Sequence, residues 1–284
     1  MALEVWRKVA RSHRAFVQER DALLLWSPHV NPCGPTLVDS VWHGTQGVLT
    51  MTRVDGIDAL AWWRGLESEA HGGVVEDGAW LSLLHQVGQW LRGLHALPPR
   101  PGADALALDE GLRARARAGL RATPSAGAMA RALTRLTAPG ERVAPAGAVA
   151  ERFAALIAHL QGDVPGAPMC RGRVPCHRDL QPRNWLVDPR GHLLAVLDFE
   201  HAREDDPLVD VLRLTDEGPA IPHGRALGAL ISGYGDPAGW EGAAARLRWL
   251  RALHALNTGL WALRHRDASF AALALTQAEA WAAG

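Results

Sequence analysis

The amino-acid sequence predicts an α+β protein in which a small antiparallel sheet with one helix precedes a larger, mostly helical region. Three observations support this class. Short alternating or β-branched runs fill the first 55 residues, stretches with apolar residues at helical spacing dominate from residue 56 onward, and a pair of short apolar strands interrupts them near residue 190. We therefore expect an N-terminal domain over residues 1–55 and a C-terminal domain over residues 56–284.

The N-terminal domain is predicted to contain a strand, a helix and a hairpin. The predicted elements are a strand over residues 4–10, a helix over residues 13–25 and hairpin strands over residues 35–42 and 46–54. Ser12 can cap the helix, and the break between the hairpin strands, His43-Gly44-Thr45, is typical of a turn. Helical patterns begin after Asp55-Gly56, which marks the domain boundary.

The C-terminal domain is predicted to consist largely of helices. Leu and Trp recur at three- and four-residue spacing in residues 77–97, and Pro98-Pro99 ends that pattern. We expect this apolar stripe to be core. Further helices are predicted within residues 100–150, over residues 148–160 and from residue 241 onward.

The composition indicates that function must lie in a localised site. The 284 residues include 30 basic and 30 acidic side chains, so the formal net charge is zero. Such a chain has no overall field that would attract nucleic acid or an anionic membrane. No stretch approaches the roughly 18 apolar residues of a membrane-spanning helix, and the first 30 residues lack a signal-peptide block. We expect a cytoplasmic protein without nucleic-acid or membrane partners.

The cysteines, Cys33, Cys170 and Cys176, are odd in number and form no Cys-x-x-Cys pair. This pattern indicates neither a disulfide framework nor a zinc knuckle. We expect buried free thiols.

One segment carries polar residues that packing does not require. After Cys176-His177-Arg178-Asp179 come two apolar strands joined by a turn-rich link over residues 188–192, which predicts an antiparallel hairpin. Asn184 begins the first strand and Asp198 ends the second, so pairing brings an amide oxygen and a carboxylate together at the open end. These hard oxygen ligands suit Mg²⁺. Asp179 lies on the loop that leads to this end and can face a substrate hydroxyl.

The same segment resembles the catalytic core of kinases. His177-Arg178-Asp179 followed by Asn184 resembles the H-R-D-x-x-x-x-N catalytic loop, and Asp198-Phe199-Glu200 resembles the D-F-G metal motif. The short distance from Asp198 to Asp210 leaves no room for an activation loop. The closer resemblance, from Lys8 onward, is therefore to the aminoglycoside phosphotransferase and choline kinase family. It implies a protein-kinase-like two-lobe fold.

The resemblance implies roles for residues of the C-terminal lobe. Asp179 would orient the acceptor hydroxyl and accept its proton, while Asn184 and Asp198 would hold Mg²⁺. Asp210, in a string that resembles the family's G-D-P-x-x-D, would brace the backbone of the catalytic loop. His177 would be a scaffold residue that bonds to the backbone.

The resemblance also implies a nucleotide site in the N-terminal lobe. Lys8, the only lysine of the chain, would align the phosphates of ATP or GTP while Glu19 on the next helix fixes it. Backbone groups of Arg53 and Val54 would meet the adenine edge. Only seven residues precede Lys8, so the sequence lacks the family's Gly-rich hairpin before the lysine strand. We therefore expect the strand around residues 5–9 to lie at a sheet edge.

Alternatives to individual assignments remain. Taken singly, Asp179, Asn184 and Asp198 are compatible with turn or cap residues, and Lys8 with a surface lysine. A second His265-Arg266-Asp267 lacks the following Asn and strand pair, and we expect it to be a solvated helix end. The acidic run Glu204-Asp205-Asp206 is expected to be solvated, with attraction of a polycation as the alternative.

Two principal functions follow. The leading hypothesis is a phosphotransferase that moves the γ-phosphate of ATP or GTP to a hydroxyl of a small molecule. The resemblance implies acceptors such as aminoglycosides and other antibiotics, choline, homoserine or sugars. The alternative is a catalytically impaired pseudokinase that acts as a nucleotide-binding or interaction module. An unrelated helical protein with a coincidental motif is a third. Mg²⁺-dependent transfer that is lost in Asp198→Ala would separate them.

Overall fold

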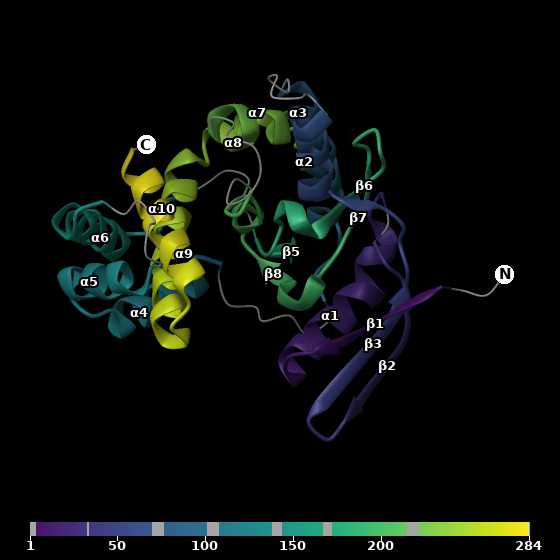
Figure 1. The fold of residues 1–284 in the computed structure, drawn as a ribbon, viewed down its shortest axis with the longest axis horizontal. Coiled ribbons are helices and arrows are strands. Elements are labelled where there is room, and N and C mark those ends of the chain that lie inside the picture. The colour runs from purple at the N-terminus through teal and green to yellow at the C-terminus, as the bar shows by residue number, and fades with distance from the viewer. Residues whose placement is uncertain are drawn as a thin grey trace. The chain divides into compact units, whose positions relative to one another are not determined.

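The computed structural model describes residues 4–32, 34–69, 77–100, 108–137, 144–166, 172–214, 221 and 223–283. Its helices and strands follow the order shown in Figure 1. The chain forms two compact units, one of residues 1–104 with 173–238 and the other of residues 105–172 with 239–284. The predicted division into lobes at residue 55 is a different partition and stays a prediction.

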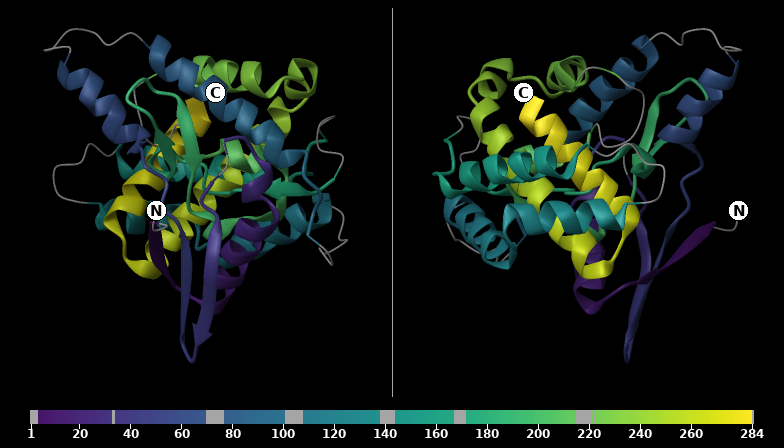
Figure 2. Two further views of the ribbon diagram at one scale, coloured as in Figure 1. Left: turned by 90° about the vertical axis from the view of Figure 1, so that its right-hand side faces the viewer. Right: turned by 60° about the vertical axis from the view of Figure 1, so that its left-hand side comes forward.

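The first unit begins with the predicted small sheet. Strands β1 (Val5–Ala10), β2 (Leu37–His43) and β3 (Gln46–Thr52) pair antiparallel in the order β1–β3–β2. Helix α1 (His13–Leu25) lies along one face of this sheet, as Figure 2 shows, and begins where the Ser12 hydroxyl accepts a hydrogen bond from the Ala15 amide at 3.2 Å. The predicted strand, helix and hairpin are confirmed.

Strand β1 lies at an edge of this sheet, as expected. Its residues alternate between the two faces. Val5 and Val9 lie on one face and are largely exposed, whereas Lys8 and Ala10 share the opposite face and are less exposed. Trp6 lies on the same face as Lys8 but is 62% exposed.

The rest of the first unit consists of helices and two very small sheets. Its helices are α2 (Ala59–Glu69), α3 (Gly78–His95) and α7 (His223–Tyr234). One sheet has the order β4–β6–β7 (Ile57–Asp58, Trp185–Val187, Leu193–Val196), and the other pairs β5 (Val174–Cys176) with β8 (Arg203–Asp205). Short 3₁₀ helices are η1 (Ser27–His29), η2 (Pro182–Asn184), η3 (Phe199–His201) and η4 (Pro207–Val211). The predicted hairpin after the catalytic loop is β6–β7.

Helix α3 supplies the core of this unit. Its stripe is almost completely buried, which confirms the prediction from helical spacing; the residues are Trp80, Leu83, Leu84, Val87, Leu91 and Leu94. Helix α7 packs directly against it. Gly88 and Gly233 lie at the crossing, where a side chain would collide with the backbone of the other helix.

The second unit is helical. Its helices are α4 (Leu108–Ala122), α5 (Ala126–Leu136), α6 (Ala146–Gln161), α9 (Ala244–His265) and α10 (Ala268–Ala283), and α8 (Pro237–Glu241) leads into it. The second His-Arg-Asp string lies where α9 ends: Arg266 is the C-cap, and Asp267 accepts hydrogen bonds from the first amides of α10. The expected exposed helix end is confirmed. In the described residues no helix has the length and apolar character needed to cross a bilayer.

Candidate active site

A cavity of about 630 Å³ lies in the first unit, between strands β1 and β3 on one side and the β6–β7 hairpin on the other. Six of the seven predicted site residues line it, namely Lys8, Glu19, Arg53, Val54, Asn184 and Asp198. The remaining residue, Asp179, is tied to this group through Asn184, as described below. The structure therefore brings together residues from both chain segments that form the first unit.

Lys8 is held at the centre of the site by carboxylates. Its Nζ lies 2.8 Å from Glu19 Oε2, 2.6 Å from Asp198 Oδ1 and 3.6 Å from Glu200 Oε2. Burial alone would lower the pKa of Lys8, but the neighbouring carboxylates of Glu19 and Asp198 raise it above its ordinary value. The predicted approach of Lys8 and Glu19 is confirmed, and the ammonium group stays charged.

Three carboxylates surround the Lys8 ammonium group, and one of them, Glu200, also faces Arg11 at 3.7 Å. Glu19, Asp198 and Glu200 lie with ligand atoms within 4.8 Å of one another. Burial raises the pKa of Glu19 to about 7, although Lys8 acts in the opposite direction. Burial would also raise the pKa of Asp198, but the attraction of Lys8 outweighs it and lowers that pKa. The ionised Asp198, whose side chain is 33% exposed, is the accessible member.

The β6–β7 hairpin places Asn184 and Asp198 at one end, as predicted. Strand β7 ends at Val196, and the Leu197 amide then donates to the Asn184 carbonyl at 2.8 Å, which extends the pairing to the mouth of the hairpin. Both Asn184 and Asp198 line the cavity. The Asn184 amide group donates to Asp179, so its carbonyl oxygen is available as a ligand. Two oxygen ligands at the mouth of one hairpin fit a divalent cation.

Asp179 lies on the loop between β5 and η2 and is 6% exposed. Its Oδ2 accepts hydrogen bonds from Gln181 Nε2 at 3.0 Å and from Asn184 Nδ2 at 3.2 Å. Its Oδ1 forms an ion pair with Arg213 Nη1. The carboxylate is therefore fixed on both oxygens, and no sequence motif indicated the contact with Arg213.

His177 is a scaffold residue, as expected. It is fully buried, its Nε2 lies 2.8 Å from the Leu197 carbonyl oxygen, and its Nδ1 lies 3.3 Å from the Asp179 amide. These contacts fit a ring that donates from Nε2 to the Leu197 carbonyl and accepts at Nδ1 from the Asp179 amide. The ring thus links the catalytic loop to the segment that carries Asp198.

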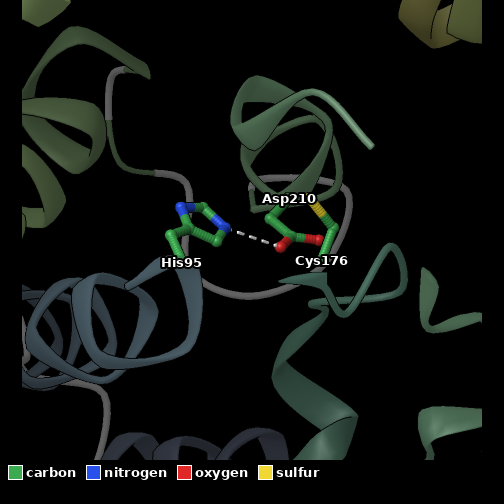
Figure 3. A group of neighbouring side chains, drawn as sticks. All are labelled: His95, Cys176 and Asp210. Carbon is green, nitrogen blue, oxygen red and sulfur yellow. Dashed lines mark hydrogen bonds and ion pairs between the residues drawn. The ribbon is translucent and has the colours of Figure 1, made fainter. Parts of the chain in front are cut away.

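Asp210 holds the backbone of the catalytic loop. Its two oxygens accept hydrogen bonds from the backbone amides of His177 and Arg178, and His95 Nε2 lies 3.0 Å from Asp210 Oδ2 (Figure 3). His95 Nδ1 is in turn 3.1 Å from the Tyr234 hydroxyl on α7. This geometry agrees with the bracing role that the resemblance implies for Asp210. His95, by contrast, was predicted only as part of a core helix.

Cys176 completes the buried group in Figure 3, but the group is a hydrogen-bond network. The Cys176 thiol lies 3.4 Å from the carbonyl oxygens of Val174 and Asp206 and donates toward them. Burial raises its pKa well above the ordinary value, so the thiol is protonated and a poor metal ligand. The expectation of a buried free thiol is confirmed for Cys176; Cys33 and Cys170 lie outside the described residues.

The acidic run is neither solvated nor available to a polycation, which corrects both expectations. Glu204 is bound by Arg100 through two nitrogen–oxygen contacts of 2.8 and 2.9 Å. Asp205 is 3% exposed and lies 3.0 Å from Arg178 Nε. Asp206 is fully buried and accepts a hydrogen bond from the Leu208 amide at the start of η4. Strand pairing and capping draw these side chains inward, which a run of charges does not reveal.

Three residues of the site escaped sequence reasoning. Arg213 follows the Asp-Pro-x-x-Asp string without a motif of its own, and Glu200 stands where the kinase motif has Gly. Trp6 lines the cavity two residues before Lys8 and belongs to none of the motifs. The period-two alternation of β1 was the available signal, because it places Trp6 and Lys8 on one face.

Comparisons with known proteins agree on the family and the fold. The profile of APH, the phosphotransferase enzyme family, matches residues 7–250. Among curated proteins none matches this sequence. Macrolide 2'-phosphotransferase MphH from Brachybacterium faecium is 23% identical, with a TM-score of 0.58 over 96% of this chain and 85% of that one.

Two further solved structures bind nucleotide and antibiotic. Aminoglycoside phosphotransferase APH(3'')-Id from Streptomyces rimosus, in complex with ADP and streptomycin, is 18% identical, with a TM-score of 0.51 over 90% of this chain and 86% of that one. A thermostable mutant of aminoglycoside phosphotransferase APH(4)-Ia, with AMP-PNP and hygromycin B, is 15% identical, with a TM-score of 0.63 over 98% and 86%. The predicted α+β, kinase-like fold is confirmed.

Proposed function

The chain belongs to the phosphotransferase enzyme family, and from this premise we propose that it transfers the γ-phosphate of ATP or GTP to a hydroxyl of a small molecule. The observation that carries the proposal is the contact of Lys8 Nζ with both Glu19 and Asp198, in a cavity that Asn184 also lines. An ammonium group, a carboxylate and an amide oxygen in one cavity are the groups that phosphoryl transfer requires for positioning and charge neutralisation.

The nucleotide would bind with its phosphates toward Lys8. Trp6, Met51 and Leu186 give the same cavity apolar walls suited to a base. The Arg53 amide donates to the Glu4 carbonyl at 3.0 Å. The Val54 amide is therefore the one of the two predicted amides that would meet the edge of the base. ADP and AMP-PNP in the similar structures support a nucleotide at such a site.

The metal would be held by Asn184 and Asp198. Bound Mg²⁺ would supply neutralisation of the charge on the phosphates. The protein's own contribution is the arrangement of the two oxygen ligands at the mouth of β6–β7, with Lys8 fixing Asp198 at 2.6 Å. The close grouping of the Glu19, Asp198 and Glu200 carboxylates supports the binding of a cation there.

Asp179 would orient the acceptor hydroxyl and accept its proton. The Asn184 side chain donates to both the backbone and the carboxylate of Asp179. These hydrogen bonds connect the residue that would bind the acceptor to a residue that would bind the metal. The macrolide and aminoglycosides named for the similar structures support an antibiotic hydroxyl as the acceptor.

The test is transfer of radiolabelled γ-phosphate from ATP and GTP to a macrolide, streptomycin, hygromycin B and water, with Mg²⁺ present. We expect transfer to at least one acceptor, its loss in Asp198→Ala, and its retention in Arg225→Ala, which removes an exposed ion pair with Asp77 on the same unit. Nucleotide binding without transfer to any acceptor would support the pseudokinase alternative. Failure to bind either nucleotide would overturn the proposal.

A further inference from the structure

Arg213 contacts the candidate base directly, and neither the family motif nor the proposed function assigns it a role. Its Nη1 forms an ion pair with Asp179 Oδ1, and its side chain is 19% exposed. The pair joins two elements far apart in sequence, the catalytic loop and the segment after η4. This contact makes Arg213 the nearest cation to the carboxylate that would receive the acceptor proton.

The segment that carries Arg213 also holds the backbone of the catalytic loop. Asp210 lies three residues earlier, at the end of η4, and accepts from the amides of His177 and Arg178. Arg213 lies in the turn after η4, where the Leu212 and Leu214 amides each donate to a carbonyl three residues earlier. Asp210 therefore fixes the main chain of the loop, and Arg213 fixes the side chain of Asp179.

The hydrogen bonds on Asp179 determine where an acceptor can reach it. Each oxygen of an ionised carboxylate accepts about two hydrogen bonds. Oδ2 already accepts from Gln181 and Asn184, whereas Oδ1 has Arg213 as its described partner. An acceptor hydroxyl that approaches the carboxylate would therefore bind at Oδ1, beside the guanidinium group.

Nearby carboxylates have cations of their own. Asp205 is paired with Arg178, and Glu204 with Arg100. Arg213 is paired with Asp179. Arg213 is therefore the arginine that orients the Asp179 carboxylate.

We propose that Arg213 is a positioning residue for phosphoryl transfer, which holds the Asp179 carboxylate turned so that Oδ1 faces the acceptor hydroxyl. The inference rests on the proposed function. In the step, the hydroxyl oxygen forms a bond to the γ-phosphorus, the bond from that phosphorus to the β–γ bridging oxygen breaks, and the hydroxyl proton passes to Asp179 Oδ1. The guanidinium group keeps its charge throughout.

The experiment measures γ-phosphate transfer to water and to the accepted acceptor by the full chain and its variants, together with Mg²⁺–nucleotide affinity by calorimetry. We expect Arg213→Ala to lower kcat by about 10²-fold through misplacement of the base, with nucleotide affinity unchanged. Guanidinium chloride at millimolar concentration should restore part of the activity of Arg213→Ala, whereas tetramethylammonium chloride should not. Asp179→Asn should gain nothing from either salt.

Two further variants keep the test decisive. Arg213→Lys keeps a charge and should retain intermediate activity, and Arg213→Gln keeps a donor without charge and should resemble Arg213→Ala. These two give the comparison if Arg213→Ala loses its cooperative melting transition. Arg225→Ala is the matched control and should behave as wild type with either salt.

Three outcomes would count against the inference. Wild-type turnover in Arg213→Ala or Arg213→Gln, with Asp179→Asn inactive, would overturn it and leave the proposed function intact. Loss of activity in a folded Arg213→Ala that guanidinium does not restore, with Arg213→Lys equally inactive, would assign Arg213 a purely structural role. A wild-type chain that transfers phosphate to neither water nor any acceptor would overturn the proposed function, and this inference with it.

Discussion

One ammonium group, that of Lys8, is shared by three carboxylates of the candidate site. Its contacts with Glu19 and Asp198 are 2.8 and 2.6 Å, and Glu200 lies slightly further away at 3.6 Å. A compact cation with three donors can serve several partners at once, which the planar fork of arginine cannot do in the same space. This packing explains why the single lysine of an arginine-rich chain lies here.

Lys8→Ala is therefore expected to weaken the binding of Mg²⁺–ATP. The loss of a charged hydrogen bond, about 1.5–3 kcal/mol, corresponds to an affinity lower by tenfold or more on the order-of-magnitude scale. Lys8→Arg should not restore the affinity, because the larger fork changes the reach and shape of the charge. Calorimetric titration of the two variants and wild type checks this. Equal affinity in Lys8→Ala would remove Lys8 from the nucleotide site.

Asp179→Asn is expected to keep the fold and nucleotide binding but to lower transfer by about 10²–10⁴-fold. The substitution keeps the shape of the side chain and removes its capacity to accept a proton. The buried contacts with Gln181 and Asn184 can persist on an amide oxygen. Melting temperature, nucleotide affinity and kcat, measured together, separate the catalytic effect from a folding defect. Unchanged turnover would exclude Asp179 as the base.

At the scale of elements, the crossing of α3 and α7 sets the position of the loop brace. His95 ends α3 and Tyr234 ends α7, and the two side chains meet at 3.1 Å before His95 reaches Asp210. The close approach of helices α3 and α7 depends on Gly88 and Gly233. A Cβ on Gly88 would lie 2.8 Å from the Tyr234 amide nitrogen, and one on Gly233 would lie 2.7 Å from the His85 carbonyl carbon.

Gly233→Ala is therefore expected to destabilise the first unit by about 1–3 kcal/mol, because backbone atoms cannot yield to the new methyl group as a flexible side chain would. Gly228→Ala, on the same helix with open space around it, is the matched control. It should stabilise α7 by about 1 kcal/mol through helix propensity alone. Thermal melts of the two variants decide the matter. Opposite shifts are expected, and equal shifts would mean that the helices are not in tight contact at Gly233.

Elements with a long periodic pattern could be predicted from the sequence, and those defined by a partner could not. The alternation before Ser12, the stripe of α3 and the two hairpins were all predictable, because each buries one face of a local pattern. Strands β4, β5 and β8 are two or three residues long and exist only through pairing with distant strands. Helix α7 was not anticipated, although it packs along α3.

The same contrast applies to the site. Asn184 and Asp198 could be predicted because they flank one hairpin, and Asp179 because it lies on the loop that leads to it. Arg213 and His95 reach Asp179 and Asp210 from separate elements, so no spacing along the chain indicated them. The prediction that the acidic run Glu204-Asp205-Asp206 is solvated was wrong for the same reason. Arg100 and Arg178, which pair with Glu204 and Asp205, lie elsewhere in the sequence.

At the scale of the whole molecule, a formal net charge of zero means that the response to pH depends on individual buried groups. Glu19 is 2% exposed, and burial raises its pKa to about 7 against an ordinary value of 4.5. A comparison of wild type with a variant at Glu19 isolates this effect.

Glu19→Gln is expected to gain stability relative to wild type as pH rises from 5 to 8. Between the unfolded pKa of 4.5 and the folded value of about 7, the native state keeps a proton that the unfolded chain has released, so wild-type stability falls as pH rises through this range. Glutamine keeps the shape without the proton. The relative gain should reach at most on the order of 3 kcal/mol above pH 7.

Denaturant unfolding at several pH values between 5 and 8 measures this difference, with Glu151→Gln, an exposed site on α6, as the matched control. The control should follow wild type at every pH. A difference between Glu19→Gln and wild type that stays constant with pH would show that Glu19 is ionised throughout, and that Lys8 neutralises it more completely than its burial suggests. Glu19 and Asp198 would then share the ammonium group without a proton on Glu19, and the negative charge available to a divalent cation would be larger.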